Sequence, residues 1–455
     1  MKKLLILFLF IVVYFAARIP MYPQKMRGED GGFAAIPTKL PTLPKYMITA
    51  RVENKDIFSH INHPALNYEI LKIVGVVTPL SSKWTQLSPY WLTTWCRVCF
   101  SLYELVFFLA LLCLLLFSSS FPSRSIKNWT LVTLFIYAIS PLAVSTSTWL
   151  QLDNTAGVVT SGFFALVLLW GVEHSKSKMF LPLLFLSSMV GAFGKNEWGL
   201  MLLISLFFVW AVLLFFPQII EIEKKKTLHK ILLIAVIGCI FGHLINWLYG
   251  PKNYTGGMTF MLAGGPGAVG SMSEKITRFI VFTVRRFPIL LNLVFALGFS
   301  VYVLWKKRKP VNFFVLILLV YSAGLFSMFF FSLAFPITRY FTPSFVVAMA
   351  ALIAICQEGL SEKNKKIWRG VLIFTVLHML SSTLHRSVET FAFHYVDGYH
   401  EQPIPQGCVP FLDGQWMIRG VDYVFEGLPE YGAQDMVDEN SPHHLKVCPK
   451  PPPAG

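Results

Sequence analysis

The sequence predicts an all-α polytopic membrane protein with about eleven transmembrane helices. Hydrophobic residues make up 55% of the 455-residue chain and charged residues only 14%, whereas soluble domains carry roughly 25% charged residues. Apolar stretches of about 20 residues, enough to cross a hydrocarbon layer of ~30 Å, recur along most of the sequence. Positive charge also alternates between successive short connections, as expected when the chain crosses a membrane repeatedly.

The first ten expected spans lie within residues 1–356, and one more follows them. Each is bounded by charged residues, prolines or polar turns, which are costly to place in hydrocarbon. The spans are expected near residues 3–20, 99–118, 129–147, 156–173, 179–194, 197–216, 230–249, 287–305, 312–333, 339–356 and 369–385.

The distribution of Lys and Arg predicts the orientation of these spans. Cytoplasmic loops accumulate positive charge, and six basic clusters fall on the same side of the predicted topology. The alternate connections at 148–155 and 195–196 carry almost no positive charge. The basic clusters are Lys2-Lys3, Arg124 with Lys127, Lys176 with Lys178, Lys224 to Lys226 with Lys230, Lys306 to Lys309, and Lys363 to Arg369.

The formal net charge of +15 follows largely from these loops. Basic residues beside spans set topology and contact anionic lipid headgroups. An excess of Lys and Arg that comes from loops beside spans does not indicate nucleic-acid binding. The expected partner is therefore the lipid bilayer.

Three regions are expected to face outward from a transmembrane domain that covers residues 1–385. They are residues 21–97, residues 250–286 and a tail at 386–455. The second contains Gly264-Gly265-Pro266-Gly267, which could make it a lid over a site. In the tail, Cys408 and Cys448 could form a disulfide in an oxidising compartment, and the sequence leaves this open.

The first outward region holds the strongest candidate site. Glu29 and Asp30 stand just after the first span, and Gly31-Gly32 would let a ligand approach the backbone closely. Adjacent carboxylates at the surface of a membrane domain are typical of a functional site. Residues 69–77 are apolar on one face but too short to cross, which predicts a helix along the membrane interface.

The order of the polar motifs resembles that of GT-C glycosyltransferases, among them the protein mannosyltransferase, aminoarabinose transferase and lipopolysaccharide galacturonosyltransferase types. Those proteins open with a span, an acidic outward loop and an interfacial helix introduced by His-Pro-Pro-Leu. Here that element is His63-Pro64-Ala65-Leu66, one residue different. The stretch that begins at Arg97 is similar to the Arg-Leu-x-x-Ala-Leu that opens their next span.

Three further motifs follow in the same order. Asp153 lies in a polar outward turn, and Lys195 with Glu197 resembles a Thr-Lys-Gly turn in which Gly194 replaces the Thr. Arg339-Tyr340 begins a stretch similar to Arg-Tyr-Leu-x-Pro. The resemblance covers about residues 1–356, and the tail has no counterpart.

The resemblance implies transfer of a sugar from a polyprenyl-phosphate donor to a hydroxyl acceptor at the outer membrane face, with inversion at the anomeric carbon. Asp30 is the expected base, and Glu29 is its partner or, together with Asp30, a ligand of a divalent cation. No cofactor is certain. Residues expected to bind substrate are His63, Arg97, Asp153, Lys195, Glu197, Arg339 and Tyr340.

Other interpretations of the same residues remain. Arg339 could anchor a span at the headgroups, Lys195 and Glu197 could form a local ion pair, and His63-Pro64 could simply begin a helix. A transporter or flippase for a lipid-linked or anionic substrate is the main alternative function, and a non-catalytic membrane subunit is another. A transporter commonly shows repeated halves, and the two halves show no repeat.

The sequence favours a bacterial inner membrane with the active site on the periplasmic side, and an endoplasmic reticulum setting stays open. The sugar and the length of the lipid carrier are not specified by the sequence. The acceptor could be a glycan, a lipid or a protein.

Overall fold

The structure is a computed structural model that describes nine long α-helices, two short 3-10 helices and their nearest flanks. The described residues are 2–22, 89–118, 124–139, 152–220 apart from 195, 225–249, 310–332 and 342–358, with short pieces between 143 and 148, 254 and 298, and 373 and 380.

Long α-helices make up almost all of this described part. They are α1 (Lys2–Arg18), α5 (Pro89–Phe117), α6 (Arg124–Ala138), α8 (Leu152–His174), α9 (Phe180–Gly194), α10 (Asn196–Phe215), α11 (Lys225–Tyr249), α15 (Phe313–Ser332) and α16 (Thr342–Glu358). Short 3-10 helices, η1 (Ile19–Met21) and η3 (Pro217–Ile219), follow α1 and α10.

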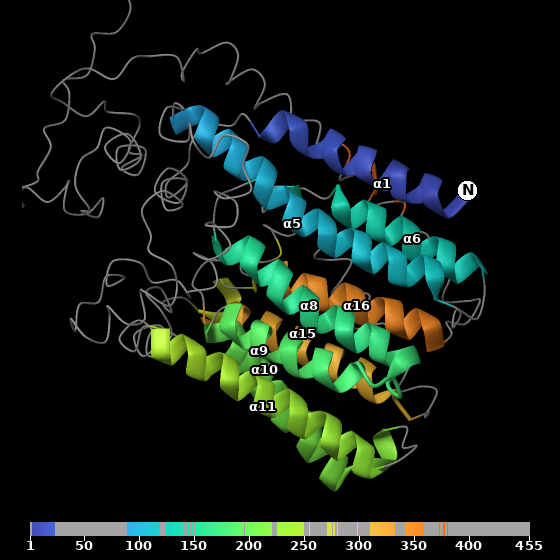
Figure 1. Cartoon of the computed structure of the whole chain (residues 1–455), viewed down its shortest axis with the longest axis vertical. Helices are drawn as coiled ribbons and strands as arrows, with labels where there is room; N and C mark the ends of the chain where they lie inside the picture. Colours follow the sequence, from blue (N-terminus) through green and yellow to red (C-terminus); the bar gives the residue numbers. More distant parts are fainter. Residues whose placement is uncertain are drawn as a thin grey trace, which may run out of the picture.

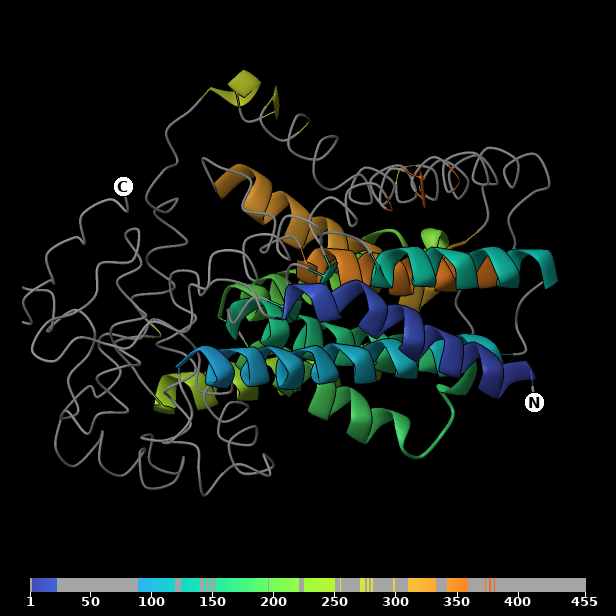
Figure 2. The same ribbon diagram turned by 90° about the horizontal axis from the view of Figure 1, so that it is seen from above.

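The helices lie side by side in one bundle whose two edges are formed by different parts of the chain (Figure 1). At one edge α1 packs with α5 and α6, and at the other edge α9, α10 and α11 pack together. Between them α8 contacts α5, α9, α15 and α16. The view from above also places α1 next to α5 (Figure 2). Helix α8 is therefore the centre of the bundle.

The composition of these helices fits a membrane environment. Four of them are long and apolar enough to cross a bilayer, namely the helical stretches Lys2–Met21, Arg97–Phe117, Asn196–Phe215 and Lys226–Leu248. Shorter apolar helices occupy Val159–His174, Phe180–Gly194 and Phe313–Met328. Many large apolar side chains, such as Phe207, Phe208 and Phe215 on α10, remain exposed. Such surfaces are stable in contact with lipid.

Most of the expected spans coincide with a described helix. The all-α polytopic fold is therefore confirmed, whereas the expected spans at 287–305 and 369–385 fall largely outside the described residues. Most of the outward regions at 21–97 and 250–286 and the tail at 386–455 also lie outside them.

The two largest differences from the expected helix boundaries are at the start of α5 and the end of α6. Helix α5 begins at Pro89 rather than near residue 99, because proline is well suited to the first turn of a helix. Helix α6 ends at Ala138 rather than near 147. Pro141 follows shortly afterwards in the sequence, and the residues before a proline disfavour continued helix.

Glycines allow α11 to approach α9 closely. A Cβ atom at Gly238 would lie 2.5 Å from the Phe185 carbonyl oxygen, and one at Gly242 would lie 2.8 Å from the Ala192 Cβ. No side chain fits at either position unless the helices separate. Small residues at such crossings are a common means of packing membrane helices.

Candidate functional site

The helix ends that flank the predicted site residues gather at one end of the bundle, which we call the outer end. The C-terminal end of α1, the N-terminal end of α5 and the C-terminal end of α11 all lie there, opposite the N-terminus (Figure 1). Helices α9 and α10 are joined by a single residue, Lys195. Because α10 leads into α11 through the other end, the α9–α10 turn is also at the outer end.

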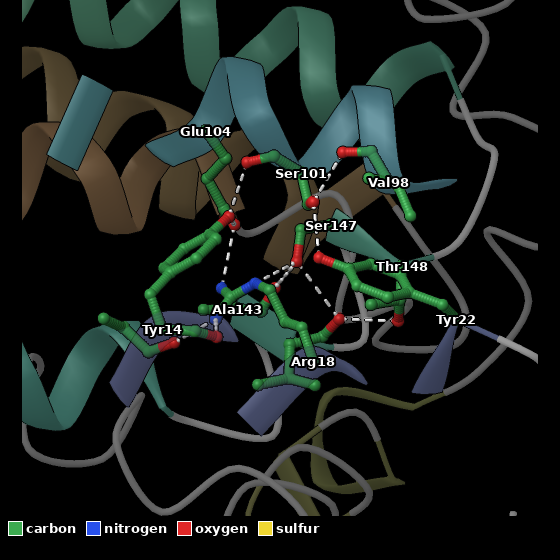
Figure 3. Close-up of polar contacts among 11 residues, drawn as sticks. Tyr14, Arg18, Tyr22, Val98, Ser101, Glu104, Ala143, Ser147 and Thr148 are labelled. Atoms are coloured by element: carbon green, nitrogen blue, oxygen red, sulfur yellow. Dashed lines mark hydrogen bonds and ion pairs between the residues drawn. The ribbon is translucent and has the colours of Figure 1, made fainter. Parts of the chain in front are cut away.

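A group of buried polar side chains connects α1, α5 and residues 143–148 towards this end (Figure 3). We call it the Arg18 cluster, and it comprises Tyr14, Arg18, Tyr22, Ser101, Glu104 and Ser147. Its charged members form an ion pair in which Arg18 Nη2 lies 2.9 Å from Glu104 Oε2. Arg18 is 0% exposed and Glu104 2% exposed.

The remaining donors of Arg18 are used by backbone and hydroxyl oxygens. Arg18 Nε donates to Ser147 Oγ at 2.7 Å, and Nη1 donates to the Ala138 carbonyl at 2.7 Å. The guanidinium also stacks over the Tyr14 ring at 3.5 Å from its centroid. The Tyr14 hydroxyl lies 2.9 Å from Glu104 Oε2 and 2.7 Å from the Ser101 carbonyl. These contacts satisfy a buried cation that would otherwise be very costly in a membrane domain.

A second buried arginine holds the point where the chain leaves α1 and η1. Arg97 is 1% exposed, and its Nη1 donates to the Tyr22 carbonyl at 2.9 Å. The hydroxyl groups of Tyr22 and Ser101 are 2.6 Å apart. Two bonds from α5 therefore fix Tyr22, which stands seven residues before Glu29 in the sequence.

Only some of the predicted site residues fall in the described part. Arg97 lies two turns inside α5 rather than before it, since the helix begins at Pro89. Asp153 lies in the first turn of α8, and Glu197 lies in the first turn of α10 and is partly buried. Outside the described residues are Glu29, Asp30, His63, Lys195, Arg339 and Tyr340.

The glycine that departs from the Thr-Lys-Gly pattern has a structural reason. A Cβ atom at Gly194 would lie 2.5 Å from the Thr160 Oγ1 atom of α8. Thr160 is fully buried, so its side chain already occupies the space that a threonine at position 194 would need. Gly194 thus lets the end of α9 pack directly on α8.

Sequence analysis did not identify the Arg18 cluster, although a signal was present. Glu104 is a carboxylate within an expected span, and Arg18 is a cation near the outer end of the preceding span. Ionisable residues in neighbouring membrane helices are usually paired. This rule would have predicted the Arg18–Glu104 ion pair.

Two polar residues of α11, His243 and Asn246, are buried in the bundle. Asn246 Nδ2 bonds to a neighbouring helix, donating to the Ala192 carbonyl of α9 at 3.1 Å. His243 instead pairs through Nδ1 with the hydroxyl of Tyr254, at 3.2 Å. No group of three or more metal-ligating side chains occurs among the described residues, and the Glu29-Asp30 pair lies outside them.

Comparison with known proteins identifies the fold. No protein-family model matches the chain, and no curated protein matches it in sequence. Among solved structures it is similar to the crystal structure of ArnT from Cupriavidus metallidurans bound to undecaprenyl phosphate, with a TM-score of 0.57 and 11% sequence identity. The match covers 98% of this chain and 89% of ArnT. The chain therefore has the GT-C-like polytopic membrane fold that the resemblance implied.

Proposed function

We propose that this protein is a glycosyltransferase that moves a sugar from a polyprenyl-phosphate donor to a hydroxyl acceptor at the outer membrane face. The observation that supports this most directly is the likeness in fold to ArnT, over nearly the whole chain, in a structure bound to undecaprenyl phosphate. The order of the outward motifs along the sequence supports the same function.

The proposed reaction is a single displacement at the anomeric carbon. Asp30 takes the proton from the acceptor hydroxyl as its oxygen attacks this carbon. The bond between the anomeric carbon and the phosphate oxygen breaks on the opposite side, and polyprenyl phosphate leaves with the bonding electron pair. Glu29 orients Asp30 or holds a divalent cation with it. His63, Lys195, Arg339 and Tyr340 bind the donor, and cations among them balance the charge on the leaving phosphate.

For Arg97 we propose a positioning role rather than phosphate binding. Its side chain is buried and donates to the Tyr22 carbonyl, so in this arrangement it positions the start of the acidic loop. Asp153 and Glu197 each stand in the first turn of a helix, and in this proposal they contact substrate or orient Lys195.

A transfer assay on the purified full-length protein tests this function. Undecaprenyl phosphates carrying glucose, mannose, galactose or arabinose serve as radiolabelled donors, and lipid A, short glycans and Ser/Thr peptides serve as acceptors. We expect label to move to one acceptor class and bare undecaprenyl phosphate to accumulate in equal amount. Loss of activity with a chelator, restored by a divalent cation, would add the metal.

A flippase is distinguished in the same preparation. Proteoliposomes that contain a fluorescent polyprenyl-phosphate sugar in one leaflet report lipid movement as accessibility to an added quencher. Lipid movement without sugar transfer from any donor would contradict the proposed enzyme and favour the transporter.

A further inference from the structure

The chain is held by neighbouring helices on both sides of Lys195, the single residue that joins α9 to α10. Lys195 lies outside the described residues, whereas Gly194 and Asn196 are described and buried. Because consecutive Cα atoms are about 3.8 Å apart, a link of one residue between two fixed helix ends has little freedom to rearrange. The contacts of its neighbours therefore decide where the backbone at position 195 can lie.

On the α9 side of the turn, the chain packs against α8. A Cβ atom at Gly194 would lie 2.5 Å from the Thr160 Oγ1 atom and 2.7 Å from the Thr160 Cβ. Thr160 is fully buried, so its side chain cannot turn away into solvent. A side chain at position 194 would therefore push the end of α9 away from α8.

On the α10 side of the turn, a tyrosine of α15 bonds to the backbone. Tyr321 is fully buried, and its hydroxyl donates to the Trp198 carbonyl at 3.4 Å and lies 3.3 Å from Ser161 Oγ of α8. Trp198 stands three residues after Lys195 and is itself fully buried. Tyr321 thus connects the first turn of α10 to α15 and α8.

The two helices also meet each other close to the turn. A Cβ atom at Gly199 would lie 2.7 Å from the Ala192 Cα. Ala192 and Gly199 stand three residues before and four residues after Lys195. Contacts with α8, with α15 and between α9 and α10 therefore hold the backbone around Lys195 from three directions.

Such a fixed backbone favours the binding of an anion by a lysine. Ordering a flexible segment costs conformational entropy, and binding that must order it is weaker by that amount. A lysine on a turn that is already ordered loses only the freedom of its own side chain. The α9–α10 turn therefore has the properties of a preorganised support for the Lys195 side chain at the outer end.

We propose that Thr160, Gly194 and Tyr321 are positioning residues that hold the α9–α10 turn so that Lys195 meets the phosphate of the lipid-linked donor. They act through the backbone on either side of Lys195 and do not touch the phosphate. This inference rests on the proposed glycosyltransferase function, in which Lys195 binds the donor, and adds how its position is set.

Equilibrium binding of bare undecaprenyl phosphate to the full-length protein in detergent tests this inference. Lys195→Ala should weaken binding by roughly tenfold to a hundredfold, as loss of a charged hydrogen bond does. Gly194→Ala should weaken it by about fivefold to tenfold, because binding must then order roughly one residue of loosened backbone. Tyr321→Phe removes only the hydroxyl and should weaken binding by up to about fivefold.

Combination with Lys195→Ala separates positioning from a general structural effect. A positioning residue acts through Lys195, so Gly194→Ala and Tyr321→Phe should cause no further loss of affinity in a chain that already carries Lys195→Ala. Residues that only stabilise the fold would weaken binding by the same factor in both backgrounds.

Gly191→Ala is the matched control, three residues before Gly194 on the same helix. A Cβ atom there would lie 3.3 Å from Leu202 Cδ2, the end of a flexible side chain, so the added methyl group can be accommodated. This variant should bind the lipid with the wild-type affinity. Thermal unfolding in the same detergent shows which variants are folded, and Tyr321→Phe alone decides if Gly194→Ala does not fold.

Three results would overturn the inference, and they differ in what else they remove. If Gly194→Ala and Tyr321→Phe bind like the wild type, or keep their losses beside Lys195→Ala, the contacts only stabilise the fold and the proposed function stands. If Lys195→Ala itself binds like the wild type, Lys195 is not a phosphate ligand and has no position to be set. If the wild type does not bind undecaprenyl phosphate, the donor in the proposed function is wrong and this inference fails with it.

Discussion

At the scale of single residues, the Arg18–Glu104 ion pair gains its importance from its surroundings. Both side chains are buried between helices, Tyr14 also bonds to Glu104, and Ser147 also bonds to Arg18. A buried ion pair contributes little net stability compared with an apolar pair, but one member left alone is a buried, unbalanced charge. The two residues should therefore behave very differently when changed singly and together.

We predict that Glu104→Leu destabilises the protein by about 3–5 kcal/mol because it leaves Arg18 uncompensated. The double variant Arg18→Leu with Glu104→Leu should recover most of this loss. Thermal unfolding in detergent, followed by circular dichroism, measures the difference. Tyr103→Phe, next to Glu104 but outside the cluster, is the control. A double variant no more stable than Glu104→Leu would contradict the pairing.

Arg97 offers a second test at this scale, because a phosphate ligand and a backbone anchor respond differently to substitution. As an anchor of Tyr22, it contributes about 1.5–3 kcal/mol to stability, as charged hydrogen bonds do. We expect Arg97→Met to lower the unfolding temperature and kcat while the affinity for bare undecaprenyl phosphate stays the same. If Arg97→Met instead binds the lipid more weakly and keeps the wild-type stability, Arg97 is a ligand of the lipid phosphate.

At the scale of helices, the sequence predicted the existence of each described span better than its limits. Apolar length alone located α9 and α10 almost to the residue, and it located the end but not the start of α11. Pro89 and Pro141 mark the start of α5 and the end of α6, and the length of the apolar stretches beside them did not predict these limits. Side-chain pairing between helices, as for Arg18 with Glu104, depends on rotation about each helix axis, which the uniform hydrophobicity of these spans does not specify.

The glycine contacts between α9 and α11 carry a prediction at the helix scale. A methyl group at position 242 would lie 2.8 Å from the Ala192 Cβ and 3.0 Å from the Phe193 backbone nitrogen. Overpacking of this kind costs about 1–3 kcal/mol, so Gly242→Ala should unfold at lower temperature. Gly298→Ala is the matched control because a Cβ there meets nothing within 4 Å. Equal midpoints for the two variants would contradict the close helix crossing.

At the scale of the whole molecule, the basic loops predict one orientation for the entire bundle. Lys178 lies in the connection between α8 and α9 and is exposed, and Glu274 is exposed in the region expected to face outward. In a variant whose native cysteines are replaced by serine, Glu274→Cys should react with a membrane-impermeant thiol reagent on intact cells. Lys178→Cys should react only after permeabilisation, and the reverse pattern would invert the topology.

The likeness in fold to ArnT extends over 98% of the chain. Motif order along the sequence was enough to predict the fold because topology fixes which loops share a membrane face. Arg97 lies inside α5 and donates to the Tyr22 carbonyl, a contact that its position in the motif did not predict, and its contact with substrate stays a prediction. Asp30 and Glu29 remain predictions.

The most direct test of the proposed function is sugar transfer from polyprenyl phosphate by the wild type and by Asp30→Asn, with Glu53→Gln from the same outward region as control. Losing a general base costs roughly 10²–10⁴-fold in rate, so Asp30→Asn should fall by that factor while still binding undecaprenyl phosphate. Glu53→Gln should keep the wild-type rate. Equal transfer by the wild type and Asp30→Asn would remove Asp30 as the base, and no transfer by the wild type from any donor would contradict the glycosyltransferase itself.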